Sequence, residues 1–489
     1  MSQLKPKIQL KKIPLHLLCV VSGIALAAPV RAATFNFMHD FGTSPEIVDA
    51  FDRAGDIWSS ILYDDVEVNI FVKYDQMASD TVLGGARPEM VEVGYNQYLN
   101  HTFRDITSED DLRAFKNLQF DADDTGIATI LDRFGLADIS QLTLSQVLRL
   151  NREAIALSTE TFGMLRDRTD GSGTVLDDNG NANNRTIWLT RANAKALGLM
   201  PGYDNTVAFD SEIAINSNVL SNSDIWDFSR VYNNNVAIAN GKLDFMSVAL
   251  HEIGHSLGFV SGIDTANMLY MMAESGEGAP VQETDLTYVS TLDLFRHSET
   301  SREANVFDWT CGTGKYFSLD GGATNLGNFA GGVSARGDGY QTSHWQKQDN
   351  SLGIMHPTLQ KGQILDISAI DRQLLDVTGW DLDLSNLSRG NGPNRTTQGK
   401  RGTDTLMSWM SSWWNSWTTG SWGPWWMEFD GDNKPTQYYS TLDDAIAQPS
   451  AESASGEAVS VPEPTSVMGL LGLGALGLGA LHKRHSRQS

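Results

Sequence analysis

Cysteine is scarce in this 489-residue chain, which has only Cys19 and Cys311. Cys19 lies in an N-terminal apolar stretch that we expect to be removed, so Cys311 has no partner for an intramolecular disulfide. Basic residues are also few, with 36 Lys and Arg against 60 Asp and Glu and a formal net charge of -24. A protein that binds a nucleic-acid backbone requires a basic face, so the acidic charge argues against nucleic acid as a partner.

Apolar runs are short as well, and both lie near the chain ends. Ile13 to Ala28 follows four lysines and precedes the small-residue pattern Val30-Arg31-Ala32. This order predicts a signal peptide over residues 1–32. An uncleaved membrane anchor is the alternative, although the run is shorter than the ~20 residues that a transmembrane helix needs. An exported protein without a disulfide must gain its stability from core burial and bound metal.

Residues 33–383 carry the patterns of a folded α+β domain with a mixed sheet. The spacing of apolar residues predicts helices over 51–62, 142–156 and 191–197, and strands over 66–74, 187–190 and 212–215. Turns are predicted at Asp170–Gly173 and Asp178–Gly180. Their acidic and amide groups could also hold a structural Ca²⁺, but ordinary loop turns are the favoured interpretation.

Composition changes after residue 383. Residues 384–460 are predicted to be a linker and a low-complexity region, and seven of the thirteen tryptophans fall within 406–429. These tryptophans could stack on sugars, pack on the folded domain or touch a membrane interface. Packing or membrane contact is favoured.

The most informative segment is a helix predicted over 243–259, with Asp244 as N-cap and Gly258 at its end. It contains His251-Glu252-Ile253-Gly254-His255. Histidines four residues apart share one helix face and can bind one tetrahedral ion. Glu252 beside them suits a general base that acts on water.

A catalytic zinc needs three protein ligands and one open position. Gly258 stands three residues after His255, but Ser261 occupies the place where a nearby third histidine would stand. Further along, Ser343-His344-Trp345 is followed, eleven residues after the histidine, by Met355 in Gly353-Ile354-Met355-His356-Pro357. The alternatives for the third ligand are Asp264, Glu274, His297 and His356.

These motifs resemble the leishmanolysin-like branch of the metzincins, a class of zinc metallopeptidases. The resemblance is specific over residues 245–260 and 343–357, and elsewhere it concerns only the order of elements. It implies a zincin-like catalytic domain with an active-site helix and a C-terminal helical subdomain. It also implies one catalytic Zn²⁺ bound by His251, His255 and His344, with Glu252 as general base and Met355 as an apolar support. Residues 262–341 would then be an insertion, and Asp264 is expected to cap the turn after the helix.

The expected function is hydrolysis of protein or peptide substrates by a secreted zinc endopeptidase. Glu212 to Ile215 is a candidate edge strand for an extended peptide, and an ordinary buried strand is the equal alternative. Two other functions stay open. One is a surface or matrix binding protein that keeps the scaffold without turnover, and the other is hydrolysis of a different bond.

The C-terminus has three parts in order: Val461-Pro462-Glu463-Pro464, an apolar run from Val467 to Leu481, and a basic end. This arrangement over residues 461–489 resembles a PEP-CTERM sorting signal. The resemblance implies an exosortase-type enzyme as partner and a Gram-negative source. It also implies display at the cell surface, the outer membrane or the extracellular matrix, with membrane or matrix contact through the tail.

Overall fold

The computed structural model describes residues 32–382, apart from short gaps at 76, 78–81, 151–154, 205, 221–224, 231–236, 240, 277 and 335, and also residues 425–429. The predicted signal peptide, most of the linker and the sorting tail lie outside the described residues. Within this part of the chain, no helix is long and apolar enough to cross a membrane.

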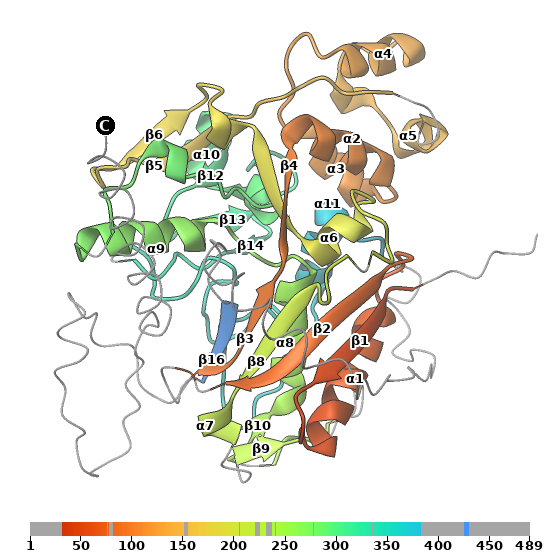
Figure 1. Ribbon diagram of the computed structural model, residues 1–489. Coiled ribbons are helices and arrows are strands. Elements are labelled where there is room, and N and C mark those ends of the chain that lie inside the picture. Colours follow the sequence, from red (N-terminus) through yellow and green to blue (C-terminus); the bar gives the residue numbers. More distant parts are fainter. Residues whose placement is uncertain are drawn as a thin grey trace, which may run out of the picture. The chain divides into compact units, whose positions relative to one another are not determined.

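A six-stranded mixed sheet forms the centre of the molecule (Figure 1). Its strands, in spatial order, are β1 Thr34–His39, β2 Glu67–Asp75, β8 Ser211–Asn216, β3 Val82–Pro88, β16 Trp425–Phe429 and β15 Thr358–Leu359. β1, β2 and β8 are parallel, whereas β3 is antiparallel to β8. The expected α+β class with a mixed sheet is therefore confirmed.

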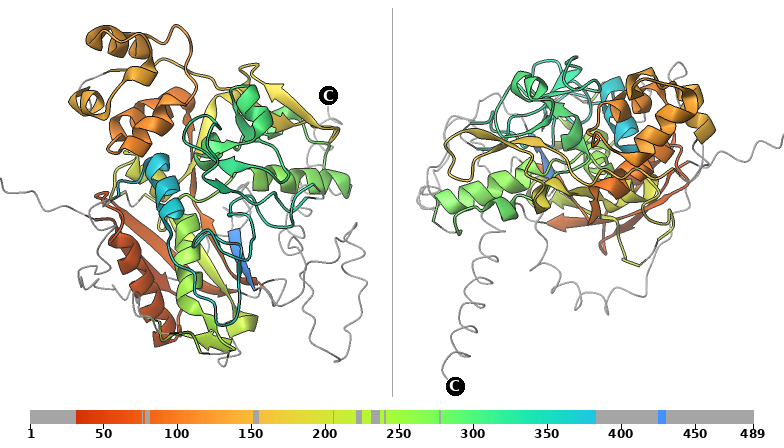
Figure 2. Two further views of the ribbon diagram at one scale, coloured as in Figure 1. Left: turned by 180° about the vertical axis from the view of Figure 1, so that it is seen from behind. Right: turned by 90° about the horizontal axis from the view of Figure 1, so that it is seen from above.

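Two helices cover one face of this sheet, α1 Pro45–Ser59 and α8 Phe245–Leu257. They lie side by side when the molecule is seen from behind (Figure 2). The alternation predicted for the second strand fits this burial, because Val68, Ile70 and Val72 of β2 are fully buried. Trp58 of α1 is also fully buried, and its Nε1 donates a hydrogen bond to the carbonyl oxygen of Leu250 at 3.2 Å.

The strand expected over 212–215 is present as β8, but it is not an edge strand. It pairs with β2 on one side and with β3 on the other. Ile213 and Ile215 are fully buried, so the strand has neither a free backbone edge nor an open face for a peptide. The peptide-binding expectation for Glu212 to Ile215 is wrong, because apolar alternation marks burial without revealing strand order.

A helical region lies at one end of the sheet. It consists of α2 Tyr95–Asp105, α3 Glu109–Lys116, α4 Thr125–Phe134 and α5 Leu144–Leu150, and α11 Ala369–Gly379 packs against α2 and α3. The helix predicted over 142–156 corresponds to α5; residues 151–154 of that range lie outside the described residues, and residues 155 and 156 are not helical. Asp124 caps α4, and Gly135 ends it with φ 62°.

Short strands build the remaining layers of the domain. They are β4 Met90–Gly94, β5 Met164–Asp167, β6 Thr174–Asp177, β7 Thr186–Thr190, β9 Trp226–Asp227, β10 Leu243–Asp244, β11 Arg296–His297, β12 Phe307–Trp309, β13 Tyr316–Phe317 and β14 Gly327–Asn328. The predicted turn at Asp170–Gly173 joins β5 to β6, where Asp170 Oδ1 accepts hydrogen bonds from the backbone and hydroxyl of Ser172. The remaining helices are α6 Arg191–Ala196, α7 Ser217–Leu220, α9 Ile263–Glu274 and α10 Glu299–Glu303.

The part after α8 is not the helical subdomain that the sequence suggested. α9, α10 and α11 are separated by the short strands β11 to β15 and by long irregular stretches. Residues 262–341 are also tied into the domain, because β12 extends the β5–β6 hairpin as a parallel strand. Frequent Gly, Ser and Asp shorten the regular elements here, since these residues satisfy the backbone through local turns.

Candidate metal centre

Helix α8 is fixed in place at both ends. At its start, the side chain of Asp244 accepts a hydrogen bond from the Ser247 backbone and forms a buried ion pair with Arg230. At its end, Gly258 has φ 127°, a conformation that residues with a Cβ rarely adopt. The predicted cap and helix end are both present. Every residue of the helix is buried, so it is a core element whose polar side chains face a protected interior.

Three imidazoles meet in that interior. His251 and His255 come from α8, and His344 comes from the irregular segment after β14. Their Nε2 atoms lie 3.1 Å (His251 to His255), 3.2 Å (His251 to His344) and 3.3 Å (His255 to His344) apart. We call these residues the histidine cluster. Metal–nitrogen bonds of about 2.0–2.1 Å in tetrahedral geometry place ligand nitrogens about 3.3 Å apart, so the spacing fits one ion.

The other ring nitrogens show which tautomer each histidine adopts. Nδ1 lies 2.7 Å from the Ile354 carbonyl oxygen in His251, 2.7 Å from that of Phe259 in His255 and 3.2 Å from that of Gln341 in His344. A carbonyl oxygen only accepts, so each Nδ1 carries the proton. In the neutral rings each Nε2 then presents a lone pair to the same point. Three converging lone pairs repel one another unless a cation lies between them, and this donor set suits Zn²⁺.

Burial favours the neutral form of His251 and His255. His251, His255 and Glu252 are fully buried, and His344 is 1% exposed. Burial lowers the pKa of His251 to about 3. Burial, together with the proximity of His251 and His344, lowers the pKa of His255 well below its usual value. Neutral imidazole is the form that binds a metal, so the electrostatic environment favours ligation at physiological pH.

Glu252 faces the central sheet at strand β3. A Cβ added at Gly84 would lie 3.2 Å from Glu252 Oε1. The absence of a side chain at Gly84 therefore leaves room for the carboxylate between the helix and the strand. Sequence analysis did not identify Gly84, because a glycine within a strand pattern gives no indication of what it faces.

Met355 packs against the same helix. A Cβ at Gly254 would meet the Met355 sulfur at 2.5 Å, so only glycine at this position admits the methionine. Met355 is 1% exposed, and its carbonyl oxygen accepts a hydrogen bond from the backbone N–H of Trp345 at 3.0 Å. The methionine turn is thus tied to the residue that follows His344.

Asp371 holds these two segments together, and sequence analysis missed it. Its Oδ1 accepts from Trp345 Nε1 at 2.7 Å, and its Oδ2 accepts from the Ile354 backbone at 2.8 Å. Asp371 also forms a capping box with Ser368 at the start of α11. The Ser-x-x-Asp spacing could have revealed the cap, but the contact with Trp345 depends on tertiary structure.

Asp264 and Ser261 also support the segment that carries His344. Asp264 lies in the first turn of α9 and accepts hydrogen bonds from the backbone N–H of Thr342 at 2.7 Å and of Ser343 at 3.1 Å, so its carboxylate holds the segment before His344, in place of the expected cap on the turn after α8. The Ser261 backbone donates to Ser343 Oγ at 2.8 Å. Ser261, which stands where a nearby third histidine was expected, therefore positions the distant one.

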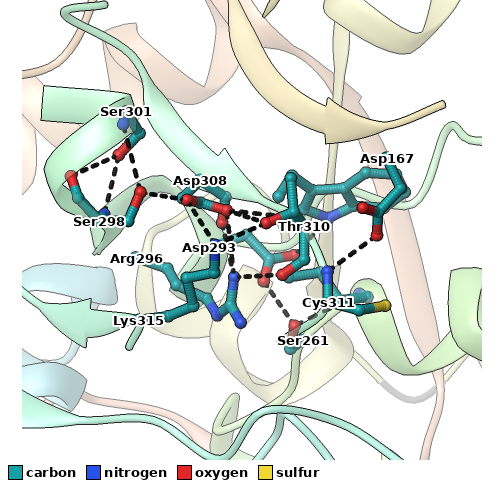
Figure 3. Close-up of polar contacts among 12 residues, drawn as sticks. Asp167, Ser261, Asp293, Arg296, Ser298, Ser301, Asp308, Thr310, Cys311 and Lys315 are labelled. Atoms are coloured by element: carbon teal, nitrogen blue, oxygen red, sulfur yellow. Dashed lines mark hydrogen bonds and ion pairs between the residues drawn. The ribbon is translucent and has the colours of Figure 1, made fainter. Parts of the chain in front are cut away.

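A buried polar network lies behind Ser261 (Figure 3). Asp293 accepts hydrogen bonds from Ser261 Oγ at 2.6 Å and from Trp309 Nε1 at 3.0 Å. Asp308 in the same region forms an ion pair with Lys315, whose Nζ lies 2.9 Å from Asp308 Oδ2. Cys311 is a buried free thiol there, and burial raises its pKa to about 12. This network anchors the insertion to the site, and the raised pKa of Cys311 disfavours its thiolate form.

The other candidate ligands lie elsewhere. Glu274 is exposed at the end of α9, and His297 lies in β11. The ring nitrogens of His356 face the carbonyl oxygens of Thr358 and Gln348, at 2.8 and 3.2 Å. None of these residues, nor Asp264, belongs to the two groups of metal-capable side chains that the described residues form. One group is the histidine cluster, and the other consists of Asp64, Asp105 and Asp381.

Comparison with known proteins yields one match. A family described as the PEP-CTERM protein-sorting motif matches residues 460–484. The motif supports export, sorting to the surface of a Gram-negative cell and recognition by an exosortase-type enzyme. No curated protein and no solved structure matches the chain.

Proposed function

We propose that residues 33–383 form a zinc-dependent endopeptidase of the metzincin type, similar to the leishmanolysin-like branch. The observation that carries the proposal is the convergence of three Nε2 atoms within 3.1–3.3 Å, with each Nδ1 held by a backbone carbonyl. The mixed sheet with a buried helix beneath it is compatible with that fold, and so is the methionine packed against Gly254 of that helix.

The residues of the site have two roles, metal binding and proton transfer. His251, His255 and His344 would hold Zn²⁺, which supplies a Lewis acid that acidifies water and polarises a carbonyl group. Glu252, next to the first histidine, accepts the proton of the attacking water at its carboxylate and delivers it to the leaving amine. The dry surroundings of Glu252 strengthen its electrostatic interactions with the reacting groups.

The substitution Glu252→Gln tests the general base. The amide has the size of the carboxylate but cannot accept the proton, so we expect kcat on a peptide library to fall by about 10²–10⁴-fold. Zinc content and thermal unfolding should stay close to those of the wild type. A binding protein without turnover would show no peptide hydrolysis in the wild type, and near-normal hydrolysis by Glu252→Gln would contradict the mechanism.

The sorting motif supports a location of this proposed activity outside the cell. We propose that the peptidase acts on extracellular or surface proteins after export, with residues 461–489 serving as an address that is separate from the catalytic domain.

A further inference from the structure

We infer that strand β16, Trp425–Phe429 of the tryptophan-rich segment, occupies the sheet edge that would bind an extended peptide in the proposed peptidase, and that it keeps the enzyme latent. The inference rests on the proposed function and adds a regulatory element that belongs to the same chain. The occupant of that edge is a segment of this chain, because β16 is the fifth strand of the central sheet (Figure 1).

β16 binds in the manner of an added strand. It runs antiparallel to β3, with Trp425 opposite Ala86 and Met427 opposite Gly84. β3 uses its other edge to pair with β8, so the edge that β16 covers would otherwise present free backbone groups. Extended peptides bind to sheet edges through such backbone hydrogen bonds. A substrate that used this edge would need the positions that β16 fills.

Both strands that pair with β16 lie next to residues of the candidate metal centre. On one side, β3 contributes Gly84, which lies against the Glu252 carboxylate. On the other side, β15 runs parallel to β16, with Thr358 opposite Glu428, and begins three residues after Met355. The strand therefore passes between the element next to the general base and the element next to the methionine support.

The register is irregular at the point closest to the general base. Pairing shifts between Met427 and Glu428, directly after the residue opposite Gly84. A bulge displaces the backbone from the regular ladder. Over Trp425 to Met427 the strand pairs with β3 as an extended substrate would. Beyond Met427 the backbone is displaced, so the peptide bond there is not held in the position of a bond that is cut. This feature favours an inhibitor over a segment that is cut.

Burial of the catalytic groups agrees with a closed site. Glu252, His251 and His255 are fully buried in this conformation. α8 contacts β16 directly, which makes the strand part of the cover. Turnover then requires that β16 leave the edge of β3.

A proline placed in the strand tests the inference. Met427→Pro in the zinc-loaded mature chain removes a backbone donor and disfavours pairing with β3. Thr418→Pro, in the same tryptophan-rich segment but before the strand, is the matched control. We expect Met427→Pro to raise kcat/KM on a quenched peptide library at least about tenfold over the wild type, and the control to leave it unchanged. A synthetic peptide with the sequence of residues 421–431 should inhibit Met427→Pro competitively.

Hydrogen exchange of residues 82–88 supplies a readout that does not need activity. Exchange there should accelerate in Met427→Pro and not in Thr418→Pro. Equal kcat/KM and equal exchange in all three proteins would overturn the latency inference and leave the peptidase proposal standing. Cleavage between Met427 and Glu428 in the wild type would also overturn it, because β16 would then be a substrate. Faster exchange without any hydrolysis in Met427→Pro would contradict the proposed function itself.

Discussion

Among the residues that the structure describes, two groups of side chains have the spacing of metal ligands, and their surroundings differ. The histidine cluster is made of neutral groups whose second nitrogens are fixed by backbone carbonyls. The other group, Asp64, Asp105 and Asp381, together with Asp111 and Asp376 nearby, forms what we call the acidic cluster. Its members are carboxyl groups that burial and mutual repulsion drive toward the protonated form.

The pKa shifts express this difference. Burial, followed by repulsion from Asp381, raises the pKa of Asp64 well above its usual value. Burial raises the pKa of Asp111 to about 6, and burial with repulsion from Asp111 raises that of Asp376 to about 8. Burial and repulsion thus favour protonation in the acidic cluster, whereas the lone pairs of the histidine cluster need a cation. Spacing alone does not define a metal site, because the arrangement of hydrogen-bond partners decides what the cluster binds.

Helix α11 carries both Asp371, which supports the segment of His344, and Asp376 of the acidic cluster. Replacing each of these aspartates by asparagine therefore compares the two clusters. Asp371→Asn at the start of the helix places an amide where Trp345, Ile354 and Ser368 all donate. The support of His344 weakens, and we expect zinc affinity to fall about 10–100-fold. Competition with a fluorescent chelator measures it. Unchanged affinity would show that Asp371 is only a helix cap.

Asp376→Asn, five residues later, should have a smaller effect, and it should stabilise the fold at alkaline pH, whereas Asp371→Asn weakens zinc binding. A carboxyl group whose pKa is raised by folding contributes stability below its unfolded value near 4, and this contribution is lost as pH rises through the folded pKa. Asp376, with a pKa of about 8, therefore destabilises the fold increasingly between about pH 4 and pH 8. The amide removes that penalty and still accepts from Ser108 Oγ.

We expect Asp376→Asn to raise Tm by about 2 °C at pH 8, and to leave it unchanged or slightly lower at pH 5. Calorimetric scans at the two pH values test this. A lower Tm at pH 8 would mean that the ionised carboxylate has a stabilising partner, such as a bound cation. The two clusters would then resemble each other more than their hydrogen bonds indicate.

The sequence was most informative where one short pattern determines both structure and chemistry. The His251–His255 pair, the Asp244 cap and the Gly258 stop are all local to one helix, and the helix is present. His344 lies about ninety residues away, so no periodicity links it to the helix, and only the resemblance of its His-Trp pair and methionine turn suggested it. The structure brings all three rings together.

Features that depend on spatial order could not be predicted. β8 reads as a half-buried strand, yet it is central because β3 and β16 lie beyond it. The acidic cluster joins residues from positions 64 to 381, and no spacing in the chain reveals it. Asp371 and Gly84 act through contacts that form only after the sheet, α8 and α11 have packed.

The most direct test of the central claim is the metal content of the purified mature protein, with a single histidine removed at a time. We predict one zinc per wild-type chain, with X-ray absorption showing nitrogen ligands at about 2.0 Å. His344→Ala should lose the metal or bind it at least about a hundredfold more weakly. His356→Ala, which removes a buried histidine outside the cluster, should retain it. Full zinc occupancy in His344→Ala, or loss of zinc from His356→Ala alone, would contradict the assignment of the histidine cluster as the metal centre.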